Sequence, residues 1–253
     1  MDKLVIRENK LIEYNGKEED KVVSIPEGIT AIGEKAFDFS NIYIRELYLP
    51  KSLTTLDDYS LAGLYLVKTL EIPETVEYVG DGAFFGWRSL EKVKIPQSIK
   101  KITTEMFGMC EDLKVVEKHN EIDEVGHSAF YDCGKLKKFD FTGVKKIGVY
   151  AFYNCKSLKE IVLPDTVTQI DDCAFESCSG LKKITLPNSI EKIGEYTFCL
   201  CTSLTSVEIP RNVKFIGKYA FGECTSLTEI RVPKGCKLNW GWKKGTNAKI
   251  VRY

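Results

Sequence analysis

The sequence predicts a tandem-repeat solenoid of mainly β structure, because three kinds of residue recur along the chain with one common period. The eight prolines follow one another at steps of 23 or 24 residues, except that Pro96 and Pro164 lie 68 residues apart, close to three steps. A phenylalanine and a cysteine recur at the same interval. About nine units of 22 to 24 residues result. Units this small bury their apolar faces only by stacking on one another.

The aromatic and cysteine series keep a fixed offset, since the cysteine stands three residues after the phenylalanine. Leu61 replaces the phenylalanine in one unit, and Ser40, Leu64 and Trp87 replace the cysteine in the first three units. We expect both positions to point into the coil. The phenylalanines are Phe37, Phe84, Phe107, Phe130, Phe152, Phe175, Phe198 and Phe221, and the cysteines are Cys110, Cys133, Cys155, Cys178, Cys201 and Cys224.

The first half of each unit is predicted to be a short strand. In the unit that begins at Leu181, apolar Ile184 and Leu186 alternate with polar Thr185, which is the period-2 pattern of a strand with one buried face. Pro187 follows and ends the strand, because proline has no N–H to donate to a ladder. Strands at this position in successive units are expected to form one parallel ladder.

The second half of the unit is predicted to turn and return. Ile190 and Ile193 indicate a second short extended or turn segment, and Gly194 follows where a bend with positive φ is expected. Phe198 and Cys201 are three residues apart, which favours one turn of α-helix or 3-10 helix. Glycine also stands at the bend position as Gly33, Gly80, Gly126, Gly148 and Gly217.

Both ends depart from the repeat and are predicted to be caps, which a solenoid needs to cover its terminal coils. We expect an N-terminal cap over residues 1–21, a solenoid over 22–233 and a C-terminal cap over 234–253, all in one continuous domain. Trp240 and Trp242 are expected to cover the open end of the core, with a ligand-stacking pair as the alternative.

Two units in the middle are irregular. One has His119 where proline is expected, and the next is one residue shorter and contains Gly143. Sequence drift is the preferred interpretation, and a bend or a recognition site is the alternative.

The repeat pattern L-x-x-I-x-I-P-x-S-V-x-x-I-G-x-x-A-F-x-x-C is similar to that of the BspA-like class of leucine-rich repeats. The segments 158–178 and 204–224 match it closely, and the resemblance covers roughly residues 22–232. It implies a leucine-rich-repeat solenoid with its strand ladder on the concave face. The family is associated with bacterial surface adhesion and protein binding.

Composition and charge exclude several classes of function. Lys+Arg and Asp+Glu each number 36, so the formal net charge is zero, which argues against a nucleic-acid partner. No apolar run approaches the ~20 residues of a membrane helix, so membrane insertion is not expected. The first residues lack the features of a secretory signal, which predicts a cytoplasmic protein. A cell-surface or secreted protein whose signal has been removed is the alternative.

The sequence gives little support for catalysis or for a bound metal or cofactor. A zinc site needs three or four converging ligands, whereas the two histidines, His119 and His127, stand among acidic residues in a predicted surface loop. No nucleophile–histidine–acid pattern and no glycine-rich phosphate loop is present. We therefore predict a non-enzymatic protein without a cofactor.

The nine cysteines are predicted to be buried free thiols. Six of them occupy one inward repeat position, where cysteine behaves as a small hydrophobe. Such thiols suit a reducing compartment. Cys173 and Cys199 lie off the series and are expected to be more exposed.

The predicted function is a non-catalytic scaffold that binds an unidentified protein partner, since a rigid curved ladder binds with little ordering cost. The candidate contact residues occupy the outward position of the first strand in each unit. An extracellular adhesin that binds host or matrix proteins is one alternative. The candidate row is Tyr48, Glu71, Lys94, Glu117, Asp140, Val162, Thr185, Glu208 and Arg231.

A stripe of mainly basic residues carries the second alternative, which is recognition of a glycan or polyanion. The more ordinary interpretation is a solvated face that discourages edge-to-edge association. The stripe is Arg45, Lys68, Glu91, Lys114, Lys137, Lys159, Lys182, Thr205 and Thr228.

Overall fold

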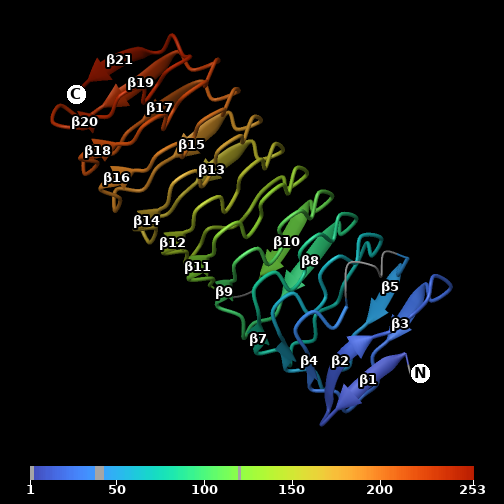
Figure 1. The fold of residues 1–253 in the computed structure, drawn as a ribbon. Helices are drawn as coiled ribbons and strands as arrows, with labels where there is room; N and C mark the ends of the chain where they lie inside the picture. Colours follow the sequence, from blue (N-terminus) through green and yellow to red (C-terminus); the bar gives the residue numbers. More distant parts are fainter. Residues whose placement is uncertain (1–2, 38–42, 119–120) are drawn as a thin grey trace.

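The computed structural model describes residues 3–37, 43–118 and 121–253 and shows an elongated stack of coils with the two termini at opposite ends (Figure 1). A regular coil contributes one strand to each of two parallel ladders and closes through a turn segment that carries the repeat phenylalanine. We name these three sides the first ladder, the second ladder and the turn side. The architecture confirms the predicted solenoid of stacked repeats.

The first ladder contains the strand predicted before each proline. In β15 (Lys183–Thr185), Ile184 is buried whereas its two neighbours are exposed, as the alternation predicts. Other strands of this ladder are β3 (Val22–Ser24), β5 (Glu46–Tyr48), β8 (Lys92–Ile95), β10 (Val115–Lys118), β13 (Glu160–Val162), β17 (Ser206–Glu208), β19 (Glu229–Val232) and β21 (Lys249–Arg252).

The second ladder contains the short segment that precedes the repeat glycine, and most of its strands have two residues. It starts at β2 (Lys10–Tyr14), which also pairs antiparallel with β1 (Leu4–Arg7). The following strands are β4 (Ala31–Ile32), β6 (Thr55–Leu56), β7 (Tyr78–Val79), β9 (Lys101–Ile102), β11 (Glu124–Val125), β12 (Lys146–Ile147), β14 (Gln169–Ile170), β16 (Lys192–Ile193), β18 (Phe215–Ile216) and β20 (Lys237–Leu238).

Neither ladder is one continuous sheet, but the interruptions fall at different coil boundaries. In the first ladder, β15 and β17 belong to separate sheets, and at that boundary β16 pairs with β18 in the second ladder. Conversely, β14 and β16 belong to separate sheets, and there β13 pairs with β15. At each of these two boundaries, strand pairing in one ladder therefore connects two coils whose strands do not pair in the other ladder.

The core is a column of stacked aromatic rings that runs along the coils. The rings of Phe152 and Phe175 have centroids 5.3 Å apart, and those of Phe175 and Phe198 lie 5.6 Å apart. Each of these three side chains has an exposed fraction of 0%. The inward assignment of the phenylalanine series is therefore correct, and aromatic stacking adds to the burial of apolar area.

The turn side differs from the single helical turn that the sequence predicts. The segment around Phe152 forms turns in which Tyr150 and Asn154 adopt left-handed φ angles of 56° and 60°. This alternation turns the Phe152 N–H toward the next coil, where the carbonyl of Ala174 accepts it at 2.8 Å. The alternate N–H groups close single turns within the coil, such as Tyr153 to Tyr150 at 3.0 Å, so the segment is a series of tight turns rather than a continuous helix. The hydrogen bonds between coils offset the free-energy cost of the left-handed backbone at these residues.

The repeat glycine is also needed for a reason that the sequence did not indicate. Gly126 and Gly148 are not among the residues with positive φ. A Cβ at Gly126 would lie 2.9 Å from the backbone of Thr103 and Thr104 in the preceding coil. Close approach between coils, rather than a special φ, therefore requires glycine here.

All nine cysteines are free and buried, which confirms the thiol prediction. Each cysteine of the repeat series donates its S–H to the carbonyl of the phenylalanine in the preceding coil, for example Cys155 to Phe130 at 3.2 Å. Cys173 and Cys199 are more exposed than the cysteines of the series, as expected, but only slightly, with exposed fractions of 8% and 5% against 0%. Both thiols pack on the turn side, where burial raises the pKa of Cys199 to about 11.

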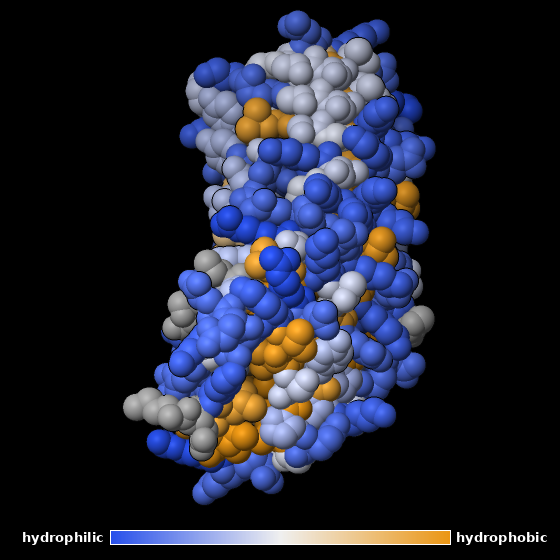
Figure 2. All heavy atoms as spheres, turned by 90° about the vertical axis from the view of Figure 1, so that its right-hand side faces the viewer, coloured by the Kyte–Doolittle hydropathy of each residue, from blue (hydrophilic) through white to orange (hydrophobic). Residues whose placement is uncertain are grey.

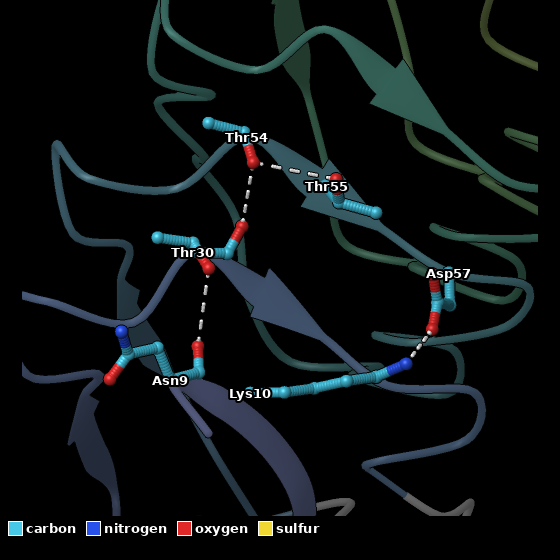
Figure 3. A network of polar contacts seen from close by, with 6 residues as sticks. All are labelled: Asn9, Lys10, Thr30, Thr54, Thr55 and Asp57. Atoms are coloured by element: carbon cyan, nitrogen blue, oxygen red, sulfur yellow. Dashed lines mark hydrogen bonds and ion pairs between the residues drawn. The ribbon is translucent and has the colours of Figure 1, made fainter. Parts of the chain in front are cut away.

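The N-terminal hairpin is attached to the stack through polar contacts, one of which spans two coils (Figure 3). The Lys10 ammonium lies 2.5 Å from the Asp57 carboxylate, two coils away. The side chain passes Gly33, where a Cβ would lie 3.1 Å from Lys10 Cε. In the core, Tyr14 stacks on Phe37 with ring centroids 4.9 Å apart.

The two tryptophans near the C-terminus have different environments. Trp242 is buried and makes an edge contact with Phe221 at 6.3 Å, as expected of a residue that covers the core. Trp240 is 70% exposed, so the expectation that it covers the core was wrong.

The irregular middle unit compensates for its missing strand with aromatic packing. Phe139 and Phe141 are buried and contact Phe152 at centroid distances of 5.4 Å. Gly143 has a φ of 84°, and a Cβ there would meet the Glu121 side chain at 2.5 Å. His119 lies outside the described residues.

Candidate interaction surface

The structure places the predicted contact row on the outward side of the first ladder. Lys94 and Glu117 are register partners, as are Val162 and Thr185, and Glu208 and Arg231. Tyr48 ends β5, whereas Glu71 and Asp140 lie outside the strands. Glu117 is half-buried and the other eight residues are exposed. The row is thus a set of adjacent pairs separated by gaps rather than one unbroken ladder.

Ion pairs use much of the charge in the middle of the row. The Lys94 ammonium lies 2.6 Å from Glu74, and the hydrogen bond with this carboxylate raises the pKa of Lys94. Glu117 pairs with Lys92 at 2.9 Å. Exposed pairs of this kind stabilise a fold by about 1 kcal/mol or less.

Asp140 is held in its charged form by several hydrogen bonds. Burial on its own would raise the pKa of Asp140, but the backbone and hydroxyl of Thr142 and the ammonium of Lys118 lower it overall. The Lys118 Nζ–Asp140 Oδ2 distance is 3.2 Å. The centre of the row therefore offers a partner little unpaired charge.

A cleft of about 650 Å³ lies at the C-terminal part of the row, where β15 and β17 do not pair. Thr185, Glu208 and Arg231 from the predicted row line it. Arg231 pairs with Glu208 at 2.9 Å and lies 5.2 Å from the centre of the Tyr253 ring. Further lining residues include Lys183, Asn188, Arg211 and Asn212. Hydrogen-bond donors are abundant here, which suits the carbonyl groups and acidic side chains of a protein segment.

The N-terminal part of the row is hollowed in a different way. Tyr48 lies between two hollows of about 480 and 420 Å³, which Leu47, Leu49, Leu66 and Leu70 help to line. Figure 2 shows apolar side chains gathered over the N-terminal coils, at the bottom of that view. The Tyr48 hydroxyl donates to Glu46 at 2.7 Å, and this bond raises the pKa of Tyr48.

The basic stripe is a column of stacked residues in space as well as in the sequence. The Lys182 N–H donates to the carbonyl of Lys159 at 2.8 Å, and the Lys137 N–H donates to that of Lys114 at 3.4 Å. Lys114 pairs with Glu91 at 2.7 Å. Within the described ranges, Lys137, Lys159 and Lys182 have no ion pair, while Glu160 lies among them.

Sequence reasoning missed several residues of the cleft. Arg211 follows the repeat proline and Tyr253 follows β21, so neither residue occupies the strand position that defines the row. Their approach depends on how successive coils are placed, which a repeat alignment does not show. A basic residue after the repeat proline was no signal either, because Lys51 and Lys234 hold the same position in other units.

The structure adds no chemical site to this surface. Among the residues that the structure describes, no group of three or more metal-ligating side chains comes together. In the same part of the chain, no helix is long and apolar enough to cross a membrane. The surface offers hydrogen bonds, charge and some apolar area.

Comparisons with known proteins agree with this architecture. A family model described as a BspA type leucine rich repeat region matches the chain in six copies, over residues 14–137 and 123–239. None of the curated proteins matches the chain.

Three solved structures have a similar fold. A leucine-rich repeat protein from Bacteroides ovatus ATCC 8483 is 21% identical, with a TM-score of 0.54 and coverage of 100% of this chain and 99% of its own. The T. pallidum leucine rich repeat protein is 23% identical, with a TM-score of 0.55 and coverage of 86% and 82%. The pneumococcal vaccine antigen PcpA is 19% identical, with a TM-score of 0.52 and coverage of 92% and 68%. At these identities the similarity concerns the fold.

Proposed function

Because this chain belongs to the BspA-type leucine-rich-repeat family, we propose that it is a non-catalytic scaffold that binds another protein through its first ladder. The observation that carries the proposal is the cleft between β15 and β17, where Thr185, Glu208 and Arg231 of the contact row converge. A scaffold that is already rigid loses little conformational freedom on binding.

The two parts of the row suit two kinds of contact. The hollow beside Tyr48 that Leu47, Leu49, Leu70 and Pro73 help to line favours an aromatic or aliphatic anchor of the partner, while the cleft favours hydrogen bonds and acidic groups. The ion-paired side chains between these two parts of the row contribute to the fit of the partner surface more than to the binding free energy.

Site-specific photo-crosslinking tests which side of the solenoid meets the partner. A photo-reactive residue at Thr185 or Tyr48 is expected to capture the same protein from a lysate or from extracellular matrix. The same residue at Gln169, which is exposed on β14 of the second ladder, is the control and is expected to capture nothing specific. Equal capture from Gln169 would contradict binding through the first ladder.

The adhesin alternative differs in the compartment of the partner. It requires the chain to reach the outside of the cell and to bind host or matrix proteins. Antibody labelling of intact cells of the native organism distinguishes the two: surface labelling supports an adhesin, and labelling only after permeabilisation supports an internal scaffold.

The polyanion alternative rests on Lys137, Lys159 and Lys182, which have no ion pair with any residue that the structure describes and so leave three charges in the stripe. Glu160 beside them reduces that charge. If the stripe binds a polyanion, replacement of these three lysines by serine abolishes retention on heparin while protein capture at Thr185 persists.

A further inference from the structure

The C-terminal end of the solenoid has a concentration of positive charge that the balanced composition of the chain conceals. Residues 234–253 contain six basic and no acidic residues, although the whole chain has a formal net charge of zero. Within the described part of the chain, none of the six has an ion pair. The six residues are Lys234, Lys237, Lys243, Lys244, Lys249 and Arg252.

The nearest carboxylates reduce this charge only in part. Glu223 packs over Gly245, where a Cβ would lie 2.4 Å from the carboxylate, and Glu229 is the register partner of Lys249. Arg252 donates to the carbonyls of Pro233 and Cys236 instead of to an acid. Lys218 approaches the Tyr219 ring at the same end, whereas Arg211 and Arg231 approach Tyr253 in the first-ladder cleft, where Arg231 pairs with Glu208. The end face is therefore cationic as a whole.

An exposed aromatic side chain lies within this charge. Trp240 is 70% exposed and touches Tyr219 in an edge contact, with ring centroids 6.0 Å apart. The Lys244 ammonium lies 6.0 Å from the centre of the Trp240 ring and 5.7 Å from that of Tyr219. Lys218 lies 5.8 Å from the Tyr219 ring. A flat apolar ring with two ammonium groups nearby is thus presented to the outside.

The backbone of the same segment adds hydrogen-bond donors. The N–H groups of Phe221 and Glu223 donate to the carbonyls of Trp242 and Lys244 in the last coil. Lys243 and Gly245 come directly after Trp242 and Lys244, so in the last coil they hold the positions that Phe221 and Glu223 hold in the coil before. Gly245 has a left-handed φ of 81°. The N–H groups of Lys243 and Gly245 have no acceptor among the described residues. N–H groups aligned by such alternating backbone are suited to anions.

We propose that this end face, centred on Trp240, Lys244 and Lys218, binds an acidic polysaccharide. A sugar ring would stack on the free area of Trp240, and its sulfate or carboxylate groups would meet the lysines and the N–H groups of Lys243 and Gly245. Charge complementarity and the single exposed indole together carry this assignment. The site is separate from the first ladder, so it does not depend on the proposed protein-binding function.

An anionic membrane is a weaker fit to the same observations. Trp240 is 70% exposed, and Phe215 and Ile250 are each 39% exposed among the described residues of this end. Interfacial binding scales with buried apolar area, and three side chains, of which two are largely covered, provide little of it. One aromatic face, in contrast, is sufficient for one sugar ring.

Binding of the full chain to immobilised heparin tests the proposal. The chain is expected to bind, and rising salt is expected to weaken binding, because exposed charges are screened. Trp240→Ala removes no charge and is expected to weaken binding about fivefold. The double variant Lys218→Ser/Lys244→Ser is expected to weaken it about tenfold. Both variants should keep the melting temperature, since these side chains are on the surface.

The matched control is the triple variant Lys137→Ser/Lys159→Ser/Lys182→Ser, which removes three charges from the basic stripe. It is expected to change heparin binding by no more than about twofold. Unchanged binding by Trp240→Ala, or an equal loss in the stripe variant, would overturn the proposal. Binding to phosphatidylserine vesicles with a tryptophan blue shift, without binding to heparin, would also overturn it.

Discussion

The indole N–H of Trp87 donates to the carbonyl of Leu61 in the preceding coil at 2.6 Å. Trp87 stands where six later units have cysteine, and Leu61 where they have phenylalanine. Those cysteines make the same bond, such as Cys133 to Phe107 at 3.1 Å. In these seven units the position therefore holds a buried side chain that carries one hydrogen-bond donor, whereas Leu64 fills the same position in another unit without a donor. Cysteine and tryptophan meet both conditions.

Substitution at Cys155 tests this requirement with two side chains of the same shape. The Phe130 carbonyl also accepts the N–H of Cys133 at 3.1 Å, so threonine keeps two bonds to it, whereas valine keeps only that one. We expect Cys155→Thr to be more stable than Cys155→Val by ~1 kcal/mol in urea unfolding, because valine loses one buried hydrogen bond. In an ordinary apolar core the order is the reverse. A more stable valine variant would show that packing alone selects cysteine.

Truncation in the aromatic column tests the core. Phe175→Ala removes the ring between Phe152 and Phe198 and is expected to cost ~3–5 kcal/mol as a core cavity. Neighbouring coils should unfold together, because coil interfaces hold the stack. The measurement is the denaturation midpoint, compared with that of the surface variant Thr185→Ala. Equal midpoints would contradict the inward position of Phe175.

The repeat glycine gives a matched pair of alanine variants. Gly126→Ala places a Cβ 2.9 Å from backbone atoms of the preceding coil and is expected to destabilise by ~1–3 kcal/mol. At Gly134 a Cβ would have nothing within 4 Å, so Gly134→Ala is expected to be neutral or to stabilise by up to ~1 kcal/mol. Thermal unfolding of both variants measures the difference. Similar losses at both sites would refute the close-approach explanation.

The buried thiols predict a fall in stability at alkaline pH. Burial raises the pKa of Cys178 to about 12 from a usual value of 9.0, and burial and the Glu105 hydrogen bond raise that of Tyr59 to about 12. Above about pH 9 the unfolded chain loses thiol protons that the folded chain retains, so the free energy of unfolding decreases as pH rises. Urea unfolding with a reductant should give a constant midpoint from about pH 6 to 8 and a lower one near pH 10. A midpoint that rises over this range would have the wrong sign.

Much of the fold follows from the sequence because each coil repeats the same local choices. Alternation of Ile184 and Leu186 around Thr185 specifies a strand, and the phenylalanine series specifies the core. The turn side was not predictable in this way, since left-handed residues such as Tyr150 are unfavourable by themselves and are stabilised by bonds to the next coil.

The candidate site was predictable only as a row of positions. The outward direction of Thr185 follows from the alternation, but the cleft lies where β15 and β17 do not pair, which is a relation between coils. Arg211 and Tyr253 enter it from segments outside the row. The exposure of Trp240 could not be predicted from the sequence either, because the sequence does not show that Trp242 covers the core without it.

The affinity of two double-arginine variants for the captured partner tests the central claim most directly. Val162→Arg/Thr185→Arg places two charges on exposed register partners of the first ladder, and Gln169→Arg/Phe215→Arg places two on exposed residues of the second ladder. Binding through the first ladder predicts that the first variant loses at least about tenfold in affinity, or ~1.4 kcal/mol, while the second keeps it. Both should melt near the wild-type temperature, since exposed sites usually change stability by ~0.5 kcal/mol or less. Full affinity in the first variant, or an equal loss in the second, would contradict the account.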